Sequence, residues 1–140
     1  MRRLLITGVL TAATFVAVVI PASASFDPHF AVILDTVQSH RTDDGFRFRE
    51  HLFQIDNPSN RVGRDKGGCA QRAHRKIKCK VLVHLNGEVG GFGDLRVSGN
   101  LGPGDNRLNV TGGTGDFASV AGKVVLSGPR GRTLTFSLVD

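Results

Sequence analysis

Two carboxyl groups, those of Glu50 and Asp35, occur within short runs of apolar residues. Glu50 alternates with Phe46, Phe48 and Leu52, so a strand would place all four side chains on one face. A carboxyl group on a buried apolar face has a raised pKa and can exchange protons near neutral pH. General acid or base catalysis is therefore one interpretation of Glu50. The other is a solvated carboxylate paired with a nearby arginine.

The orientation of Asp35 stays open at this stage. Ile33 and Val37 flank it on its own face of a strand. The opposite face is equally apolar, because Val32 and Leu34 belong to it. Asp35 is accordingly a second candidate acid or base only if its face points inwards.

Other catalytic chemistries lack the residues they need. The few serines have no histidine at a spacing typical of a nucleophile–base pair. No Cys-x-x-Cys motif occurs, and the histidines are far apart in sequence, so we expect no metal site. They are His29, His40, His51, His74 and His84.

The segment NVTGGTGDFASVAG at 109–122 is rich in glycine, but it does not fit a nucleotide site. A phosphate loop needs Lys followed by Ser or Thr after its last glycine, and here Asp116 and Phe117 follow Gly115. Ala118 interrupts a dinucleotide fingerprint. We therefore expect no cofactor, and we interpret the glycines as the tight corner of a curved sheet. The corner glycines are Gly112, Gly113, Gly115 and Gly122.

The elements that position these residues are predicted to be strands. Past residue 25, apolar and polar residues alternate in short runs separated by Gly, Pro, Asn and Asp, which is typical of an all-β domain. The predicted runs are 30–38, 46–53, 76–85, 87–92, 95–97, 108–110, 123–126 and 133–139. Asn86-Gly87 is the strongest hairpin signal. Because open edges invite aggregation, we expect a closed barrel or two packed sheets.

Residues 1–24 have the pattern of a cleaved secretory signal peptide. Arg2 and Arg3 precede an apolar stretch, and Ala22-Ser23-Ala24 supplies an Ala-x-Ala cleavage site. We therefore expect export, no membrane span, and one domain at 25–140. Two of the 18 Lys and Arg residues leave with the leader, so 16 remain against 12 Asp and Glu. This small excess of positive charge does not favour nucleic-acid binding, and the chain has no Trp or Tyr to stack on bases.

Cys69 and Cys79 are the two cysteines of the chain, and both lie in the part that we expect to be exported. An even count in an oxidising compartment predicts one disulfide. A basic run, from Arg72 through His74 to Lys80, overlaps the segment between them and ends one residue beyond Cys79. This basic hairpin suggests an alternative function, which is docking on an anionic surface; its simpler interpretation is a solvated face.

Several short motifs, taken in order, resemble the barrel superfamily of allene oxide cyclases and dirigent proteins. The motifs are FRF at 46–48 before Glu50 and Leu52, VGRDKGGC at 62–69, Cys79, TGGTG at 111–115, and LTF at 134–136. The similarity is greatest to exported bacterial members of the superfamily, and it spans residues 30–139. It implies an eight-stranded antiparallel barrel with an apolar central cavity, and trimers in the plant relatives.

The resemblance also suggests residues and a function. We expect a pocket lined by Phe46, Phe48, Leu52, Val81 and Val83. Asp116 matches a corner position that some dirigent proteins use in their pocket. The arginine that commonly follows in that motif is here Ala121, so a turn residue that caps backbone N–H groups is the alternative.

These observations predict a secreted protein, a homodimer or homotrimer, that binds a small apolar molecule in its barrel. Members of the superfamily steer ring closure or radical coupling with few catalytic groups. If the protein is an enzyme, it is therefore a cofactor-free isomerase or cyclase, or a dirigent-type auxiliary. The alternative is a non-catalytic module that binds an anionic surface or a protein partner through the basic hairpin.

Overall fold

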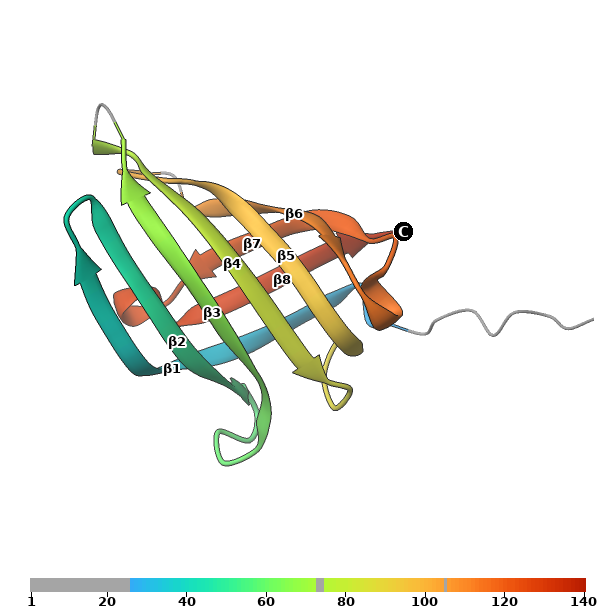
Figure 1. The fold of residues 1–140 in the computed structure, drawn as a ribbon. Helices are drawn as coiled ribbons and strands as arrows, with labels where there is room; N and C mark the ends of the chain where they lie inside the picture. The colour runs from blue at the N-terminus through green and yellow to red at the C-terminus, as the bar shows by residue number, and fades with distance from the viewer. Residues whose placement is uncertain (1–25, 73–74, 105) are drawn as a thin grey trace, which may run out of the picture.

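The structure is a computed structural model that describes residues 26–72, 75–104 and 106–140 (Figure 1). Its eight strands are β1 (His29–Thr42), β2 (Gly45–Gln54), β3 (Arg61–Gln71), β4 (Ile77–Asn86), β5 (Phe92–Leu101), β6 (Arg107–Gly113), β7 (Ala121–Ser127) and β8 (Thr133–Val139). Each strand pairs antiparallel with the next, and β8 pairs with β1 to close the barrel. The predicted all-β barrel of eight antiparallel strands is confirmed. The signal peptide expected at 1–24 lies outside the described residues.

One of the predicted runs, 87–92, was wrong, although the number of strands was right. Residues 87–91 form the turn between β4 and β5, and the run 95–97 is part of the longer β5. The sequence analysis missed β3 altogether, because glycines and charged residues take the place of an apolar alternation. A Cβ atom at Gly67 would lie 2.6 Å from the carbonyl oxygen of Lys80. The strand therefore needs glycine where β4 approaches it closely.

The inner face of the barrel follows the two-residue period of the strands. One end of the interior is packed solid by large side chains, among them Leu52, Phe117 and Phe136, which are fully buried. Phe30 stacks on Phe136 with ring centroids 4.5 Å apart. At this end the corner after β6 also closes the barrel, beside the carboxyl terminus (Figure 1). We call this region the packed end.

The glycine-rich segment forms the corner that the sequence predicted. It leaves β6, makes the 3₁₀ turn η2 (Gly115–Phe117) and enters β7. A Cβ atom at Gly113 would lie 2.4 Å from the carbonyl oxygen of Asp94, so a larger residue cannot occupy this position without displacing backbone. Phe117 follows directly and is buried under the corner. Backbone contact and a buried ring together fix the turn.

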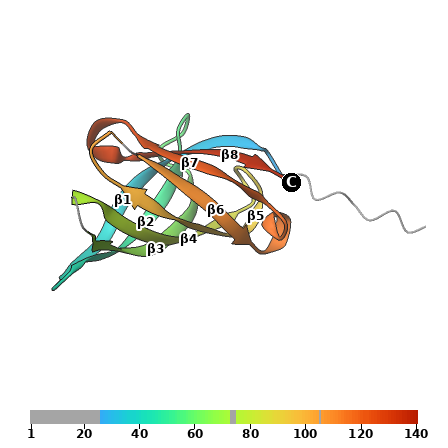
Figure 2. The ribbon, with the colours of Figure 1, turned by 90° about the horizontal axis from the view of Figure 1, so that it is seen from above.

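The opposite end of the barrel carries the β1–β2, β3–β4, β5–β6 and β7–β8 connections. The hairpin of β1 and β2 extends beyond the other strands there, as seen from the front and from above (Figures 1 and 2). Cys69 and Cys79 are register partners on β3 and β4 and form the predicted disulfide. The 3₁₀ turn η3 (Pro129–Gly131) joins β7 to β8. We call this region the hollow end, because the cavity described below opens inside it.

Candidate functional site

The hollow end encloses a cavity of about 270 Å³ inside the barrel. Most of its lining is apolar and comes from inward-facing positions of all eight strands. Four of the five expected pocket residues line it, namely Phe46, Phe48, Val81 and Val83. Leu52 instead lies in the solid core of the packed end, where it is fully buried. The volume is close to the lower limit of about 300 Å³ for small-molecule sites.

Two carboxyl groups stand side by side in this apolar wall. Glu50 on β2 and Asp65 on β3 are directly opposed register partners, and both line the cavity. Directly opposed side chains start about 4.5–5.5 Å apart at their Cβ atoms, so the two carboxyl groups can share a proton. The Thr36 hydroxyl on β1 donates a hydrogen bond of 2.8 Å to Oε1 of Glu50. This bond leaves the second oxygen of Glu50 available to a ligand or to Asp65.

Asp65 is the more deeply buried member of the pair. Its relative exposure is 4%, and its Oδ1 has no hydrogen-bond partner among the described residues. Burial, and next the negative charge of Glu50, raise the pKa of Asp65 to about 8. Asp65 therefore keeps its proton at neutral pH and can donate it. A neutral acid beside a second carboxyl group is an arrangement suited to acid–base chemistry.

The sequence analysis missed Asp65 as a functional residue. Its neighbours on the inner face of β3 are Gly63 and Gly67, so no apolar alternation marked the face. The available signal was Cys69, because residues four apart in a strand share a face and Cys69 was expected to bond to Cys79, which alternates with Val81 and Val83. With that signal, Asp65 would have been predicted to point inwards like Glu50.

The other two candidate acids lie elsewhere. Asp35 projects from the outer face of β1, where its side chain is 60% exposed and its Oδ1 lies 3.2 Å from a guanidinium nitrogen of Arg132. Asp116 lies in η2 at the packed end and accepts a hydrogen bond of 2.8 Å from the backbone N–H of Phe92. Neither residue lines the cavity, so the structure brings only Glu50 of the three predicted acids into it.

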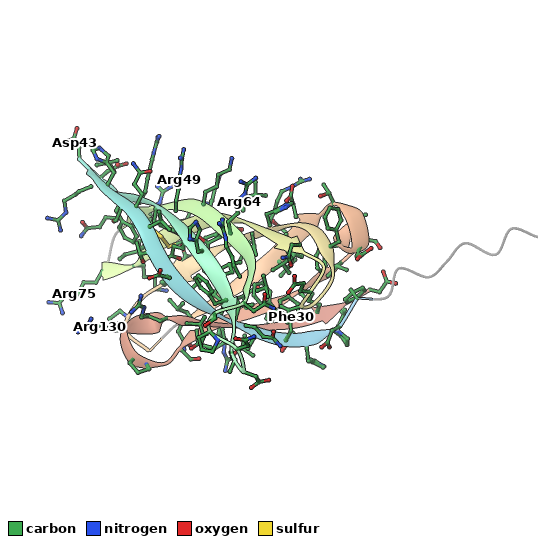
Figure 3. The ribbon with its side chains drawn as sticks, turned by 90° about the horizontal axis from the view of Figure 1, so that it is seen from below. Phe30, Asp43, Arg49, Arg64, Arg75 and Arg130 are labelled. Atoms are coloured by element: carbon green, nitrogen blue, oxygen red, sulfur yellow. A yellow bond between two sulfur atoms is a disulfide. The ribbon has the colours of Figure 1, made fainter. Side chains whose placement is uncertain are left out.

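The mouth of the cavity carries one cation. Arg130 and Gly131 of η3 contribute to the lining, and Arg130 adopts a left-handed backbone conformation with φ 60° and ψ 22°. Such a conformation is uncommon for a residue other than glycine and is often found at functional sites. In Figure 3, Arg130 lies at the same end as Asp43 and Arg75, which mark the hairpin turns of the hollow end. A polar group on a ligand would meet Arg130 as it enters.

Two features are absent from residues 26–72, 75–104 and 106–140. No cluster of three or more His, Cys, Asp and Glu side chains that could bind a metal ion occurs there. No helix in these ranges is both long enough and apolar enough to cross a bilayer.

Comparison with known proteins identifies the fold. The chain matches no family model and none of the curated proteins. Among solved structures it is similar to "Pyocyanin demethylase", with a TM-score of 0.62 and 20% sequence identity. The match covers 79% of this chain and 99% of the other. At this identity the similarity establishes a shared small barrel and nothing about substrate.

Proposed function

We propose that the protein binds a small, mainly apolar molecule in the hollow end and moves a proton on it with the Glu50–Asp65 pair. The observation that carries this proposal is the burial of Asp65 in an apolar cavity, directly opposite Glu50, with its Oδ1 left without a hydrogen-bond partner among the described residues. A lone structural carboxyl group would be costly there, because burying a polar atom without a partner costs about 1–3 kcal/mol. A ligand oxygen would supply the missing partner.

The pair can perform an isomerisation without any cofactor. The Glu50 carboxylate takes a proton from carbon next to a ligand carbonyl group, while Asp65 donates its proton to the carbonyl oxygen and so prevents charge from building up. Return of a proton to a different carbon, and of the oxygen proton to Asp65, yields an isomer and regenerates both residues. No oxidant or reductant is consumed. The apolar wall holds the ligand in one conformation, and positioning of this kind lowers the barrier further.

The similarities to known proteins support a ligand-processing role at the level of the fold. The sequence motifs resemble allene oxide cyclases and dirigent proteins, whose barrels steer ring closure or coupling. The structural neighbour is by name a demethylase acting on pyocyanin. Of these reactions, cyclisation of the bound molecule suits the Glu50–Asp65 pair best, because it needs only proton transfer and positioning.

We propose further that the chain is exported after cleavage behind Ala24 and assembles as a dimer or trimer. The disulfide between Cys69 and Cys79 supports the first statement, because such bonds form and persist in oxidising compartments. The second follows from the resemblance to plant members of the superfamily. Mass spectrometry of the protein from its own medium would give the new amino terminus, and light scattering would give the assembly.

A bicyclic ketone can test the site without knowledge of the natural ligand. We would incubate 2-tetralone with the protein in D₂O and follow exchange of the hydrogens beside its carbonyl group by NMR. The wild type is expected to accelerate this exchange, and Glu50→Gln and Asp65→Asn are each expected to reduce the acceleration about 100-fold. Asp35→Asn is the matched control, because Asp35 lies outside the barrel.

Binding is measured separately, by displacement of a neutral fluorescent probe, N-phenyl-1-naphthylamine. Val81→Phe should fill part of the cavity and weaken probe binding at least about tenfold, whereas Asp65→Asn should leave it within about twofold. Exchange that is equal in wild type and both acid variants would contradict the catalytic role. If Val81→Phe leaves the affinity for the probe unchanged, the cavity is not the ligand site.

A further inference from the structure

The outer face of the same barrel wall carries an unusual concentration of positive charge. Arg47 and Arg49 on β2, Lys66 on β3, Lys80 on β4 and Arg96 on β5 all point outwards and are exposed. They belong to adjacent strands, which lie about 4.8 Å apart in a sheet. Figure 3 shows Arg49, together with Arg64, directed away from the barrel on this side. The group extends well beyond the basic hairpin singled out in the sequence.

The strand register sorts these cations into two rows. Arg49 is opposite Lys66, Lys66 is opposite Leu82, and Leu82 is opposite Arg96, which makes the first row. In the second row Arg47 is opposite Gly68, and Gly68 is opposite Lys80. Residues two apart on a strand are about 6.6 Å apart, so the rows run parallel to each other across the strands at that separation.

Between the two rows lies a groove of about 810 Å³. Its middle row consists of Phe48, Gly67, Val81 and Val97, which are successive register partners. Phe48, Val81 and Val97 point into the inner cavity, and Gly67 has no side chain, so the floor of the groove is mainly backbone. The walls are long basic side chains from both rows. We call this feature the cationic groove.

The charges of the cationic groove are not neutralised locally. The ion pairs within the described ranges are His84–Asp94 and Arg132–Asp35, and neither involves a cation of the groove. Arg49 and Lys66 directly oppose each other, and like charges in that position destabilise a sheet. An anion lying between the rows would remove this repulsion. The fold thus keeps a locally unfavourable pair in one wall of a groove that could hold a counter-charge.

We propose that the cationic groove binds a linear anionic polysaccharide, laid across the strands between the two rows. Shape favours a chain, because a flat bilayer cannot enter a groove whose walls are long side chains. The chain has no Trp or Tyr, and Phe48, the one Phe that lines the groove, points inwards, so the groove offers none of these rings to stack on the bases of a nucleic acid. A sugar polymer with a carboxylate on each residue instead presents regularly spaced charges to both rows.

The test uses the whole secreted chain and polygalacturonate, with dextran as the neutral control polymer. Affinity is measured by calorimetry at about 0.15 M salt, where weak surface attraction is screened. We expect saturable binding to polygalacturonate that weakens at least about tenfold in the double variant Lys66→Glu/Lys80→Glu, which reverses one charge in each row. The charge-preserving Lys66→Arg/Lys80→Arg should bind like wild type within about twofold.

The matched control is Arg41→Glu/Lys123→Glu, which has the same net charge but changes exposed residues outside the groove. It should stay within about twofold of wild type. Equal loss in the two reversals, or no saturable binding, would overturn the proposal. So would equal or tighter binding to duplex DNA or to anionic lipid vesicles. Probe binding in the inner cavity should be unchanged in Lys66→Glu/Lys80→Glu, so this proposal and the proposed function fail independently.

Discussion

The two ends of this barrel are built from the same eight strands, but they use their interior differently. At the packed end, the rings of Phe30, Phe117 and Phe136 fill the space and are buried. At the hollow end, smaller side chains such as Val83 and the disulfide line a cavity of about 270 Å³, and two carboxyl groups enter it. Each buried ring removes more apolar surface from water than a valine does, so the packed end can stabilise the fold while the hollow end keeps space and a poorly solvated acid.

Truncation of one ring at each end is expected to give the largest difference. Phe136→Ala should lower the free energy of unfolding by about 3–5 kcal/mol, because it opens a void in a fully packed region. Phe48→Ala should cost about 1–2 kcal/mol, because Phe48 already borders an empty space and is half-buried. Denaturant unfolding measures both values. Equal losses of unfolding free energy in the two variants would mean that the packed end and the hollow end contribute alike to stability.

The disulfide is expected to be the main covalent support of the hollow end. Cys69 and Cys79 are 10 residues apart, and the chain-entropy model gives about 2.5–3 kcal/mol for such a link. Cys69→Ser/Cys79→Ser should lower the unfolding free energy by that amount and weaken probe binding in the cavity. A thiol titration of the native protein should find no reactive thiol. One or two free thiols would contradict the link.

The most gradual expected effect is the pH dependence due to Asp65. Between its ordinary pKa of 3.8 and the raised pKa of about 8, Asp65 is protonated when folded and ionised when unfolded. The folded state then binds more protons, so this contribution to stability is complete below pH 4 and is lost as the pH rises towards 8. The slope is at most about 1.4 kcal/mol per pH unit.

Asp65→Asn removes this titration. The difference between its unfolding free energy and that of the wild type, measured in urea at several pH values, should therefore shift steadily in favour of the variant from pH 4 to pH 8. Asp35→Asn serves as the control, since Asp35 is largely exposed. A constant difference between wild type and Asp65→Asn across this range would show that Asp65 ionises normally, and would place it outside the apolar cavity.

Sequence patterns predicted those parts of the fold in which burial shows as alternation along one strand. The strands around Phe48, Val81 and Phe136 were recognised in this way, and Glu50 was selected because it shared a face with phenylalanines. β3 and Asp65 were missed for the opposite reason. Their burial comes from side chains of the neighbouring strands, which cover a strand of glycines, and such cover depends on register rather than on local sequence.

The orientation of Asp35 depended on tertiary structure as well. Both faces of its strand are apolar, and only closure of β1 against β8 decides which one turns inwards. The register shift between Thr36 and Gln38 then brings Thr36 and Ser39 to the cavity, although these two residues are an odd number apart. A bulge of this kind re-aims side chains in a way that a strict two-residue period cannot predict.

The seam between β1 and β8 affects the order in which the barrel can fold. His29 is the register partner of Ser137, so β1 cannot gain its second neighbour until β8 has been synthesised. Contacts this distant in sequence form slowly, since a long loop must close before they contribute. Until β8 joins, the sheet stays open along this seam and leaves one edge of β1 without its partner strand.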